Sequence, residues 1–278
     1  MADMAAVEDK VHDKASRGRG GNRRGGRSGG GGQSREVQVS KALSKLLRHQ
    51  AENAGISLDG EGYAPLSKVL NWGPLKSLKV TFEDVKSVVA SNEKQRFSLK
   101  STGAEDSINV ADWLIRANQG HSIKVDAASL LVPLTEANLP PRVFHGTYFA
   151  FWPVIVETGG LKPMSRNHVH CSSGTPEEGV TSGMRKDAEL LIEVDVKASL
   201  DAGEKWWLSD NGVILSDGGD SGMVSTKYFK NVTGRKVDVG TLWKDGEKVA
   251  DLPAGIKAVV PQGKGPRGNR VRGPKPSS

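Results

Sequence analysis

The chain has 278 residues, of which 36% are hydrophobic and 26% charged, a balance typical of a globular protein with polar extensions. Cys171 is the only cysteine, which excludes an intramolecular disulfide and leads us to expect a reducing compartment, cytoplasmic or nuclear. No run of about 18 uninterrupted apolar residues occurs, and the acidic first 14 residues contain no apolar stretch, so we expect neither a membrane-spanning helix nor a secretory signal.

The formal net charge of +7 is concentrated at the two ends of the chain. Residues 14–35 carry seven Lys and Arg and no acid, residues 262–278 carry five, and residues 1–13 carry a net charge of −3, which leaves −2 for residues 36–261. Residues 17–32 contain nine Gly and five Arg and cannot bury apolar surface, so we expect disorder there and in the basic C-terminal segment. The arginine/glycine segment is either a solubilising tail or a loose RNA-binding arm.

In chain order, the first expected element is a helix that begins near Val37, with Ser40 as its candidate N-cap and Arg48 and His49 at its C-terminal end. A short helix is expected at 65–70, and Thr81 with Asp84 forms a capping-box pattern that starts another helix through about residue 90. Strands are expected at 96–99 and 112–116. Small helices followed by a β-hairpin favour a winged-helix-like lobe over residues 36–133.

A linker rich in proline and small residues is expected at 133–141. Beyond it, the pattern predicts a strand-rich second lobe over residues 134–261, with strands at 142–145, 168–172, 189–196 and 213–215. Residues 1–35 and 262–278 are assigned to basic tails. The fold class is therefore α+β, with two lobes of ordinary domain size.

Several common sites are absent from the sequence: a GxGxxG loop after a strand, the GxxxxGK[ST] loop, the GxSxG elbow and the HExxH helix. Five of the six histidines instead lie in four short polar motifs: LLRH at 46–49, IRANQGHS at 115–122, FHGT at 144–147 and MSRNHVHCS at 164–172. Three of these motifs also contain an arginine, namely Arg48, Arg116 and Arg166. The guanidinium group is a permanently charged fork of donors that suits phosphate oxygens, so three arginines and His49 could together hold a phosphate without a metal.

Each motif also has a simpler structural explanation. Arg48 and His49 could merely satisfy the last carbonyl groups of a helix. His168 and His170 share one face of an expected strand and could form a metal site with His145, but no carboxylate or thiol lies at a suitable spacing, so no metal is expected.

Other conspicuous residues are expected to be structural. Trp206 and Trp207 are interpreted as core or interlobe packing, and Cys171 as a small buried residue. The glycine-rich stretch at 218–222 is interpreted as a set of turns.

Taken in order, the motifs resemble the KptA family of tRNA 2′-phosphotransferases over about residues 40–229. The segments that carry the resemblance are SKALSKLLRH at 40–49, DGEGYAPLSKVL at 59–70, RFSL at 96–99, IRANQGHS at 115–122, FHGT at 144–147, GLKPMSRNHVHCS at 160–172, SGMR at 182–185 and NGVIL at 211–215. Two features depart from the family: Cys171 stands where an aromatic residue is common, and the arginine/glycine tail lies outside the family core.

The resemblance implies a winged-helix-like RNA lobe and a C-terminal lobe with the NAD⁺-binding fold of ADP-ribosyltransferases. It also implies a reaction in two steps. The 2′-phosphate of RNA, as found in spliced tRNA, attacks NAD⁺ and expels nicotinamide; a ribose hydroxyl then attacks the phosphate and releases repaired RNA and ADP-ribose 1″,2″-cyclic phosphate.

The family's catalytic Arg–His–Arg–Arg set corresponds here to Arg48, His49, Arg116 and Arg166. The resemblance also implies a set of residues that bind NAD⁺: His121, Ser122, His145, Gly146, Thr147, His168 and His170. The expected partner is RNA with an internal 2′-phosphate, and a monomer is expected.

Two other functions remain open. An ADP-ribosyltransferase that stops after the first step would use the same NAD⁺ chemistry on nucleic-acid phosphates or on protein, but no glutamate lies in a toxin-like catalytic context. A non-enzymatic RNA-binding module would account for the basic tail, but it gives no reason for the FHGT and RNHVH segments.

Overall fold

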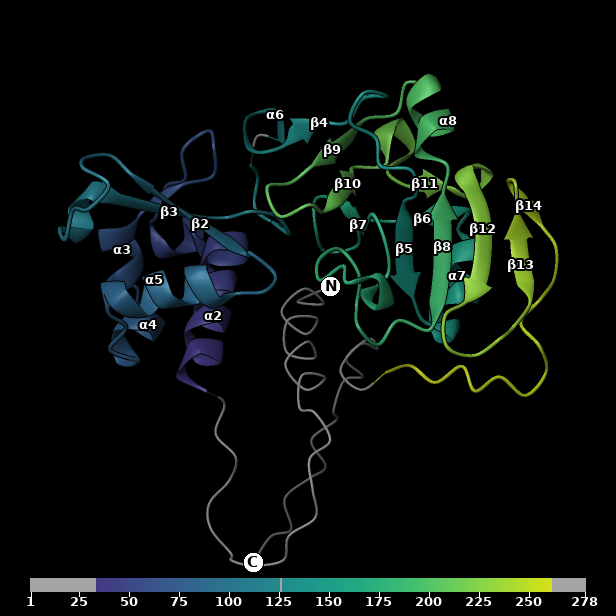
Figure 1. Cartoon of the computed structure of the whole chain (residues 1–278), viewed down its shortest axis with the longest axis horizontal. Coiled ribbons are helices and arrows are strands. Elements are labelled where there is room, and N and C mark those ends of the chain that lie inside the picture. The colour runs from purple at the N-terminus through teal and green to yellow at the C-terminus, as the bar shows by residue number, and fades with distance from the viewer. Residues whose placement is uncertain (1–33, 126, 262–278) are drawn as a thin grey trace, which may run out of the picture.

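The computed structural model describes residues 34–125 and 127–261, so most of both expected tails lies outside the described residues. Helices α2–α5 and a three-stranded sheet form one side of the molecule, and the remaining sheets form the other (Figure 1). The fold is therefore of the mixed α+β class. Within the described ranges, no helix is long and apolar enough to cross a membrane.

The N-terminal lobe, residues 34–123, begins one turn earlier than the sequence predicts. Helix α2 spans Arg35–Lys45, and its N-cap is Ser34, whose side chain accepts a hydrogen bond from Val37 N. The prediction of Ser40 as N-cap is wrong because Arg35 bonds to Asp84 and to the Leu78 and Lys79 carbonyls, which adds a first turn to the helix. Arg35 therefore belongs to this helix and not to a tail.

Three further helices complete the helical part of this lobe: α3 (Leu66–Leu70), α4 (Gly73–Ser77) and α5 (Phe82–Ser91). The predicted helices at 65–70 and 81–90 are confirmed, the second with the expected Thr81–Asp84 capping box. Helix α4 was not expected. It is a single short turn that begins at Gly73–Pro74, where proline is suited to the start of a helix.

A small antiparallel sheet of order β1–β3–β2 covers these helices. Its strands are β1 (Ala64–Pro65), β2 (Phe97–Ser101) and β3 (Trp113–Ala117). The two longer strands confirm the predicted hairpin to within two residues. Phe97, Ile115 and Ala117 are buried in one apolar cluster with Val39 and Leu43 of α2, and this cluster forms the core of the lobe.

The connection to the C-terminal lobe, residues 127–261, contains α6 (Ala127–Leu130) and β4 (Val132–Pro133). Strand β4 pairs with β9 (Trp206–Leu208), and Leu130 and Leu131 pack with Trp207. The sequence pattern predicts that these residues belong to the first lobe, but their apolar partners lie in the second. The polar segment that follows folds as a turn, with Asn138 accepting from Thr135 N.

The C-terminal lobe is built on two larger antiparallel sheets, of order β4–β9–β10–β7 and β14–β13–β12–β8–β5. The bounds of the strands not yet given are β5 (Phe144–Thr147), β7 (Val169–Cys171), β8 (Leu190–Val194), β10 (Ile214–Ser216), β12 (Phe229–Gly234), β13 (Thr241–Lys244) and β14 (Glu247–Lys248). A short pair, β6 (Gly160–Leu161) with β11 (Val224–Ser225), and helices α7 (Trp152–Glu157) and α8 (Val196–Asp201) complete it. The four strands predicted in this lobe are confirmed as β5, β7, β8 and β10, each within two residues at its ends.

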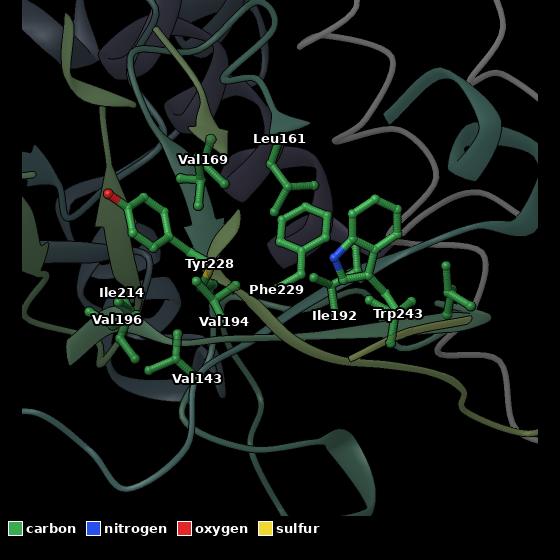
Figure 2. Packing of buried hydrophobic residues seen from close by; sticks show 14 of the residues in the cluster. Val143, Leu161, Val169, Ile192, Val194, Val196, Ile214, Tyr228, Phe229 and Trp243 are labelled. Atoms are coloured by element: carbon green, nitrogen blue, oxygen red, sulfur yellow. The ribbon is translucent and has the colours of Figure 1, made fainter. Parts of the chain in front are cut away.

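The core of the C-terminal lobe lies between these sheets. Figure 2 shows valine and isoleucine side chains of β7, β8 and β10 converging with Tyr228 and Phe229. The Phe229 and Trp243 rings are 6.3 Å apart edge to face, a favourable aromatic geometry. The alternate inward residues of β8 are buried, so this strand is fixed in register.

Three hydrogen bonds join the C-terminal lobe to one short turn of the N-terminal lobe, which contains Glu93 and Lys94. Thr181 Oγ1 donates to the Glu93 carbonyl at 3.1 Å, while Ser182 Oγ and Asn211 Nδ2 both donate to the Lys94 carbonyl, at 3.2 and 2.8 Å. The turn itself is an Asx turn in which Asn92 Oδ1 accepts from Lys94 N. These bonds set the position of the C-terminal loops relative to β3.

Candidate functional site

Arg48 and His49 lie where α2 passes into a π-helical turn, η1 (Leu46–Gln50). Leu46 and Leu47 are fully buried, and Arg48 is also buried, with 2% of its surface exposed. The Arg48 carbonyl accepts a hydrogen bond from Ser122 N at 3.0 Å, and His49 Nδ1 lies 2.8 Å from Ser122 Oγ. π-turns are rare and are frequently found at functional sites.

The segment after β3 folds over Arg48. Asn118 fixes its start, because its amide nitrogen donates to the Gln95 carbonyl and its amide oxygen accepts from Ser98 Oγ. Gly120 follows with φ +84°, and a Cβ at this position would lie 3.6 Å from the Arg48 guanidinium. A glycine here permits both the positive φ and the close approach to Arg48.

Arg116, near the end of β3, is held on three sides. Its Nη1 donates to the Glu61 carbonyl at 3.0 Å, its Nη2 pairs with Asp210 of the other lobe, and its guanidinium lies 4.7 Å from the centre of the Tyr63 ring. Arg116 Nε is buried and has no hydrogen-bond partner within residues 34–125 and 127–261. The guanidinium is thus fixed in place while its Nε–H remains unused.

Arg166 and the two histidines after it come from the C-terminal lobe. Asn167 joins the lobes, because its backbone N–H donates to the His121 carbonyl at 2.9 Å and its side chain donates to the Ile123 carbonyl at 2.8 Å. His170 Nε2 lies 2.8 Å from Gln119 Oε1. The His168 ring packs edge-on against Trp207 at 5.5 Å.

These hydrogen bonds bring charged and titratable side chains of both lobes close together, and their charges act on one another. Burial is the main cause that lowers the pKa of His121, to about 3, and the charges of Arg48, His49, His168 and Arg116 add to it. Burial likewise holds the pKa of His170 well below its usual value, with Arg166 and Arg48 among the further causes. Burial also lowers the pKa of His168. These three histidines are therefore neutral at pH 7, beside permanently charged arginines.

The FHGT segment is strand β5, and its residues differ in their contacts. His145 Nδ1 lies 2.9 Å from the His170 carbonyl, which joins it to the cluster. A Cβ at Gly146 would lie 2.5 Å from Met184 Cγ, so glycine is needed there for packing. Thr147 is buried and its carbonyl accepts from Glu189 N. The contacts of Gly146 and Thr147 thus run to the SGMR loop and the start of β8.

Several residues in these contacts were not singled out from the sequence, among them Tyr63, Asn118, Asn167 and Asp210. Tyr63 lies in the DGEGYAPLSKVL segment, Asn118 in IRANQGHS and Asn167 in RNHVH, while Asp210 directly precedes NGVIL. Their place inside or next to the motifs was the available signal. Nothing in their spacing indicates that Asp210 pairs with Arg116, 94 residues away.

The residues interpreted as structural are confirmed as such. Trp206 and Trp207 are buried in the C-terminal lobe, with 2% and 9% of their surface exposed. Cys171 is fully buried, which raises the pKa of its thiol to about 12. Gly218 and Gly222 have positive φ on either side of a 3₁₀ turn. Within residues 34–125 and 127–261, no three His, Cys, Asp or Glu residues are arranged to hold a metal ion.

Comparison with known proteins identifies the family of the chain. A family model described as RNA 2′-phosphotransferase, Tpt1/KptA family, matches residues 34–218. A tRNA 2′-phosphotransferase 1 of Danio rerio is 38% identical over 219 residues, covering 78% of this chain and 92% of its own length. That of Homo sapiens is 40% identical over 203 residues, covering 71% and 76% respectively.

The tRNA 2′-phosphotransferase of Saccharomyces cerevisiae is 44% identical over 170 residues, which cover 60% of this chain and 71% of the yeast protein. The matched family region, residues 34–218, contains Arg48, His49, Arg116 and Arg166. The chain is an enzyme that belongs to the RNA 2′-phosphotransferase family, Tpt1/KptA.

Proposed function

We propose that this enzyme removes the internal 2′-phosphate of spliced tRNA by transferring it to NAD⁺, the last step of tRNA splicing. The observation that carries the proposal is the convergence of Arg48, Arg116 and Arg166 with buried neutral histidines where the lobes meet. Fixed cations stabilise negative charge on a phosphate as its geometry changes, and they do so most strongly where water is excluded.

In this proposal Arg48, Arg116 and Arg166 bind the transferring phosphate. Arg116 is the best placed to orient it, because its guanidinium is held by the Glu61 carbonyl and the Tyr63 ring and keeps Nε for a ligand. His49, bonded to Ser122, supplies a proton or a hydrogen bond near neutral pH. Because charge is supplied by arginines, we propose that no metal takes part.

The residues around His121 are also suited to bind NAD⁺. His121 Nε2 is buried and has no hydrogen-bond partner in the part of the chain that the structure describes, and such an atom is costly unless a ligand satisfies it. We assign NAD⁺ binding to His121, Ser122, His145, Gly146, Thr147, His168 and His170. When bound, NAD⁺ supplies the electrophilic ribose carbon and the ribose hydroxyl that accepts the phosphate.

The finer architecture is part of the same proposal. The helices followed by the β2–β3 hairpin support a winged-helix-like lobe that binds RNA, and the antiparallel sheets around β5 support an ADP-ribosyltransferase-like lobe that binds NAD⁺. We propose that the enzyme acts as a monomer.

The test uses an RNA oligonucleotide with one labelled internal 2′-phosphate. With NAD⁺, the label should leave the RNA and appear as a cyclic phosphate of ADP-ribose, and a chelator should change the rate little. Without NAD⁺, the label should stay on the RNA. Release of inorganic phosphate in the absence of NAD⁺ would identify an ordinary phosphatase and refute the proposal.

A further inference from the structure

Asp210 forms an ion pair with Arg116 and so occupies one of the N–H donors with which Arg116 could bind a phosphate. In a guanidinium group Nε and Nη2 lie on one edge, and this edge can hold two oxygens of a phosphate at once. Asp210 Oδ2 takes Nη2, while Nε on the same edge is buried and without a hydrogen-bond partner among the described residues. Nη1, on the far side, is already used by the Glu61 carbonyl. A phosphate that bonds to both Nε and Nη2 therefore competes with the Asp210 carboxylate for Nη2 and can displace it.

The surroundings of Asp210 allow such a displacement. Its side chain is 43% exposed, whereas that of Arg116 is 10% exposed, so the carboxylate can turn into water while the guanidinium stays in place. The turn that carries Asp210 is anchored independently of it. Asn211 Nδ2 donates to the Lys94 carbonyl, and Gly212 N donates to the Ser209 carbonyl at 2.9 Å.

The Arg116–Asp210 ion pair also stabilises the enzyme when no substrate is bound. A guanidinium that is nearly buried is costly unless an anion faces it. Asp210 supplies that anion, and an arriving phosphate replaces one counter-charge by another. A phosphate monoester carries about −1.5 to −2 at pH 7, so it competes better for this edge than a phosphodiester with a single charge.

From this geometry we propose that Asp210 is an internal competitor for the phosphate-binding edge of Arg116, and that it thereby sets the affinity of the enzyme for the RNA 2′-phosphate. The proposal rests on the proposed function, because it takes the 2′-phosphate as the ligand of Arg116. Asp210 itself touches no substrate; it acts through Arg116.

The test compares Asp210→Asn with the unchanged enzyme, using two RNA oligonucleotides that differ only in one internal 2′-phosphate. Asp210→Asn should bind the 2′-phosphorylated RNA about fivefold tighter, the worth of one partly exposed ion pair, and should tighten binding of the unmodified RNA less. The KM for the 2′-phosphorylated RNA should fall with little change in kcat. Asp210→Glu, which keeps the carboxylate, should behave like the unchanged enzyme.

Asp220→Asn is the matched control, because it removes one negative charge from an exposed position of the same lobe. It should leave the preference for the 2′-phosphate unchanged. A second readout is the melting temperature: Asp210→Asn should melt lower than the unchanged enzyme when free, and 2′-phosphorylated RNA should raise its melting temperature by a larger amount.

Equal tightening for both RNAs would mean that only general electrostatics has changed and would overturn the proposal. Weaker binding with a lower kcat would also overturn it and would make Asp210 a residue that positions Arg116. If the unchanged enzyme fails to turn over 2′-phosphorylated RNA with NAD⁺, the proposed function fails, whereas the comparison of binding still decides the role of Asp210.

Discussion

At the scale of single residues, burial fixes the charge state of the site. His121 lies among arginines, and burial lowers its pKa from 6.5 to about 3. A histidine in the unfolded chain binds a proton below about pH 6.5, whereas folded His121 does not until about pH 3. The neutral state of His121 therefore contributes fully to the free energy of unfolding above pH 6.5. This contribution is lost as the pH falls from 6.5 to about 3.

We predict that this linkage can be measured with His121→Gln. Between pH 7.5 and pH 5, His121 should account for a loss of about 2 kcal/mol in the free energy of unfolding. Urea unfolding of the unchanged enzyme and the variant at both pH values should show a smaller loss in the variant. His168 and His170 shift in the same direction, so part of the pH dependence should persist. An identical loss in both proteins would show that His121 is not buried neutral.

A second prediction at this scale concerns Arg116. Arg116→Ala should slow turnover by roughly 10- to 150-fold, the worth of a charge-assisted hydrogen bond of about 1.5–3 kcal/mol. The second, phosphate-transferring step should suffer most, so a covalent RNA intermediate should accumulate in a gel time course. Arg116→Lys should recover only part of the rate, because an ammonium group cannot form a bidentate hydrogen bond with the phosphate. A full rate in Arg116→Ala would exclude this arginine from the reaction.

At the scale of secondary-structure elements, one arginine outside the matched family region organises a loop inside it. Arg235 follows β12, and its side chain is 3% exposed. Its Nε and Nη2 donate to the Glu177 carboxylate, and its Nη1 donates to the Lys186 and Ala188 carbonyls. The pair with Arg235 is the main reason that the pKa of Glu177 falls to about 2. These bonds tie the SGMR loop to the large sheet, next to the FHGT strand.

We predict that Arg235→Ala lowers the free energy of unfolding by about 2–3 kcal/mol, because it leaves several carbonyl groups without their donor. It should also raise the KM for NAD⁺ more than the KM for RNA, since the loop packs on Gly146 of the proposed NAD⁺ segment. Lys230→Ala is the matched control. Lys230 lies on β12, the strand that Arg235 follows, and pairs with Glu193 of β8; its side chain is 53% exposed, so its loss should cost less than about 1 kcal/mol. Equal costs for the two variants in urea unfolding would contradict the prediction.

Local patterns were enough to predict most elements, and contacts distant in sequence explain the exceptions. The Thr81–Asp84 capping box depends on residues three apart and was predicted correctly. The start of α2 was missed because it depends on Arg35 bonding to Asp84, 49 residues away. The π-turn that carries Arg48 has no marker in the hydrophobic pattern. The motifs are conspicuous in the sequence because histidine and arginine are concentrated in four short segments. The Arg116–Asp210 pair joins the two lobes and has no signal in the sequence pattern.

At the scale of the whole molecule, charge is divided between a nearly neutral folded body and basic ends. We predict that deletion of residues 1–33, which keeps Ser34 and Arg35 of α2, leaves turnover of a short RNA nearly unchanged. Binding to long RNA at low salt should weaken, and the salt dependence of affinity should become shallower with the cations removed. Fluorescence anisotropy at several salt concentrations measures both effects. A truncated enzyme without activity on short RNA would show that the N-terminal segment is part of the site.

The hydrogen bonds that join the lobes at residues 93 and 94 determine which substitutions this contact tolerates. In the three hydrogen bonds at this turn, the N-terminal lobe contributes the main-chain carbonyls of Glu93 and Lys94, and the C-terminal lobe contributes the side chains of Thr181, Ser182 and Asn211. Any amino acid provides a carbonyl, so substitutions at 93 and 94 leave the docking bonds intact. A substitution at 93 or 94 therefore keeps these three bonds, and at 93 it costs the exposed Glu93–Lys186 ion pair, whereas a substitution at Thr181, Ser182 or Asn211 removes a docking bond.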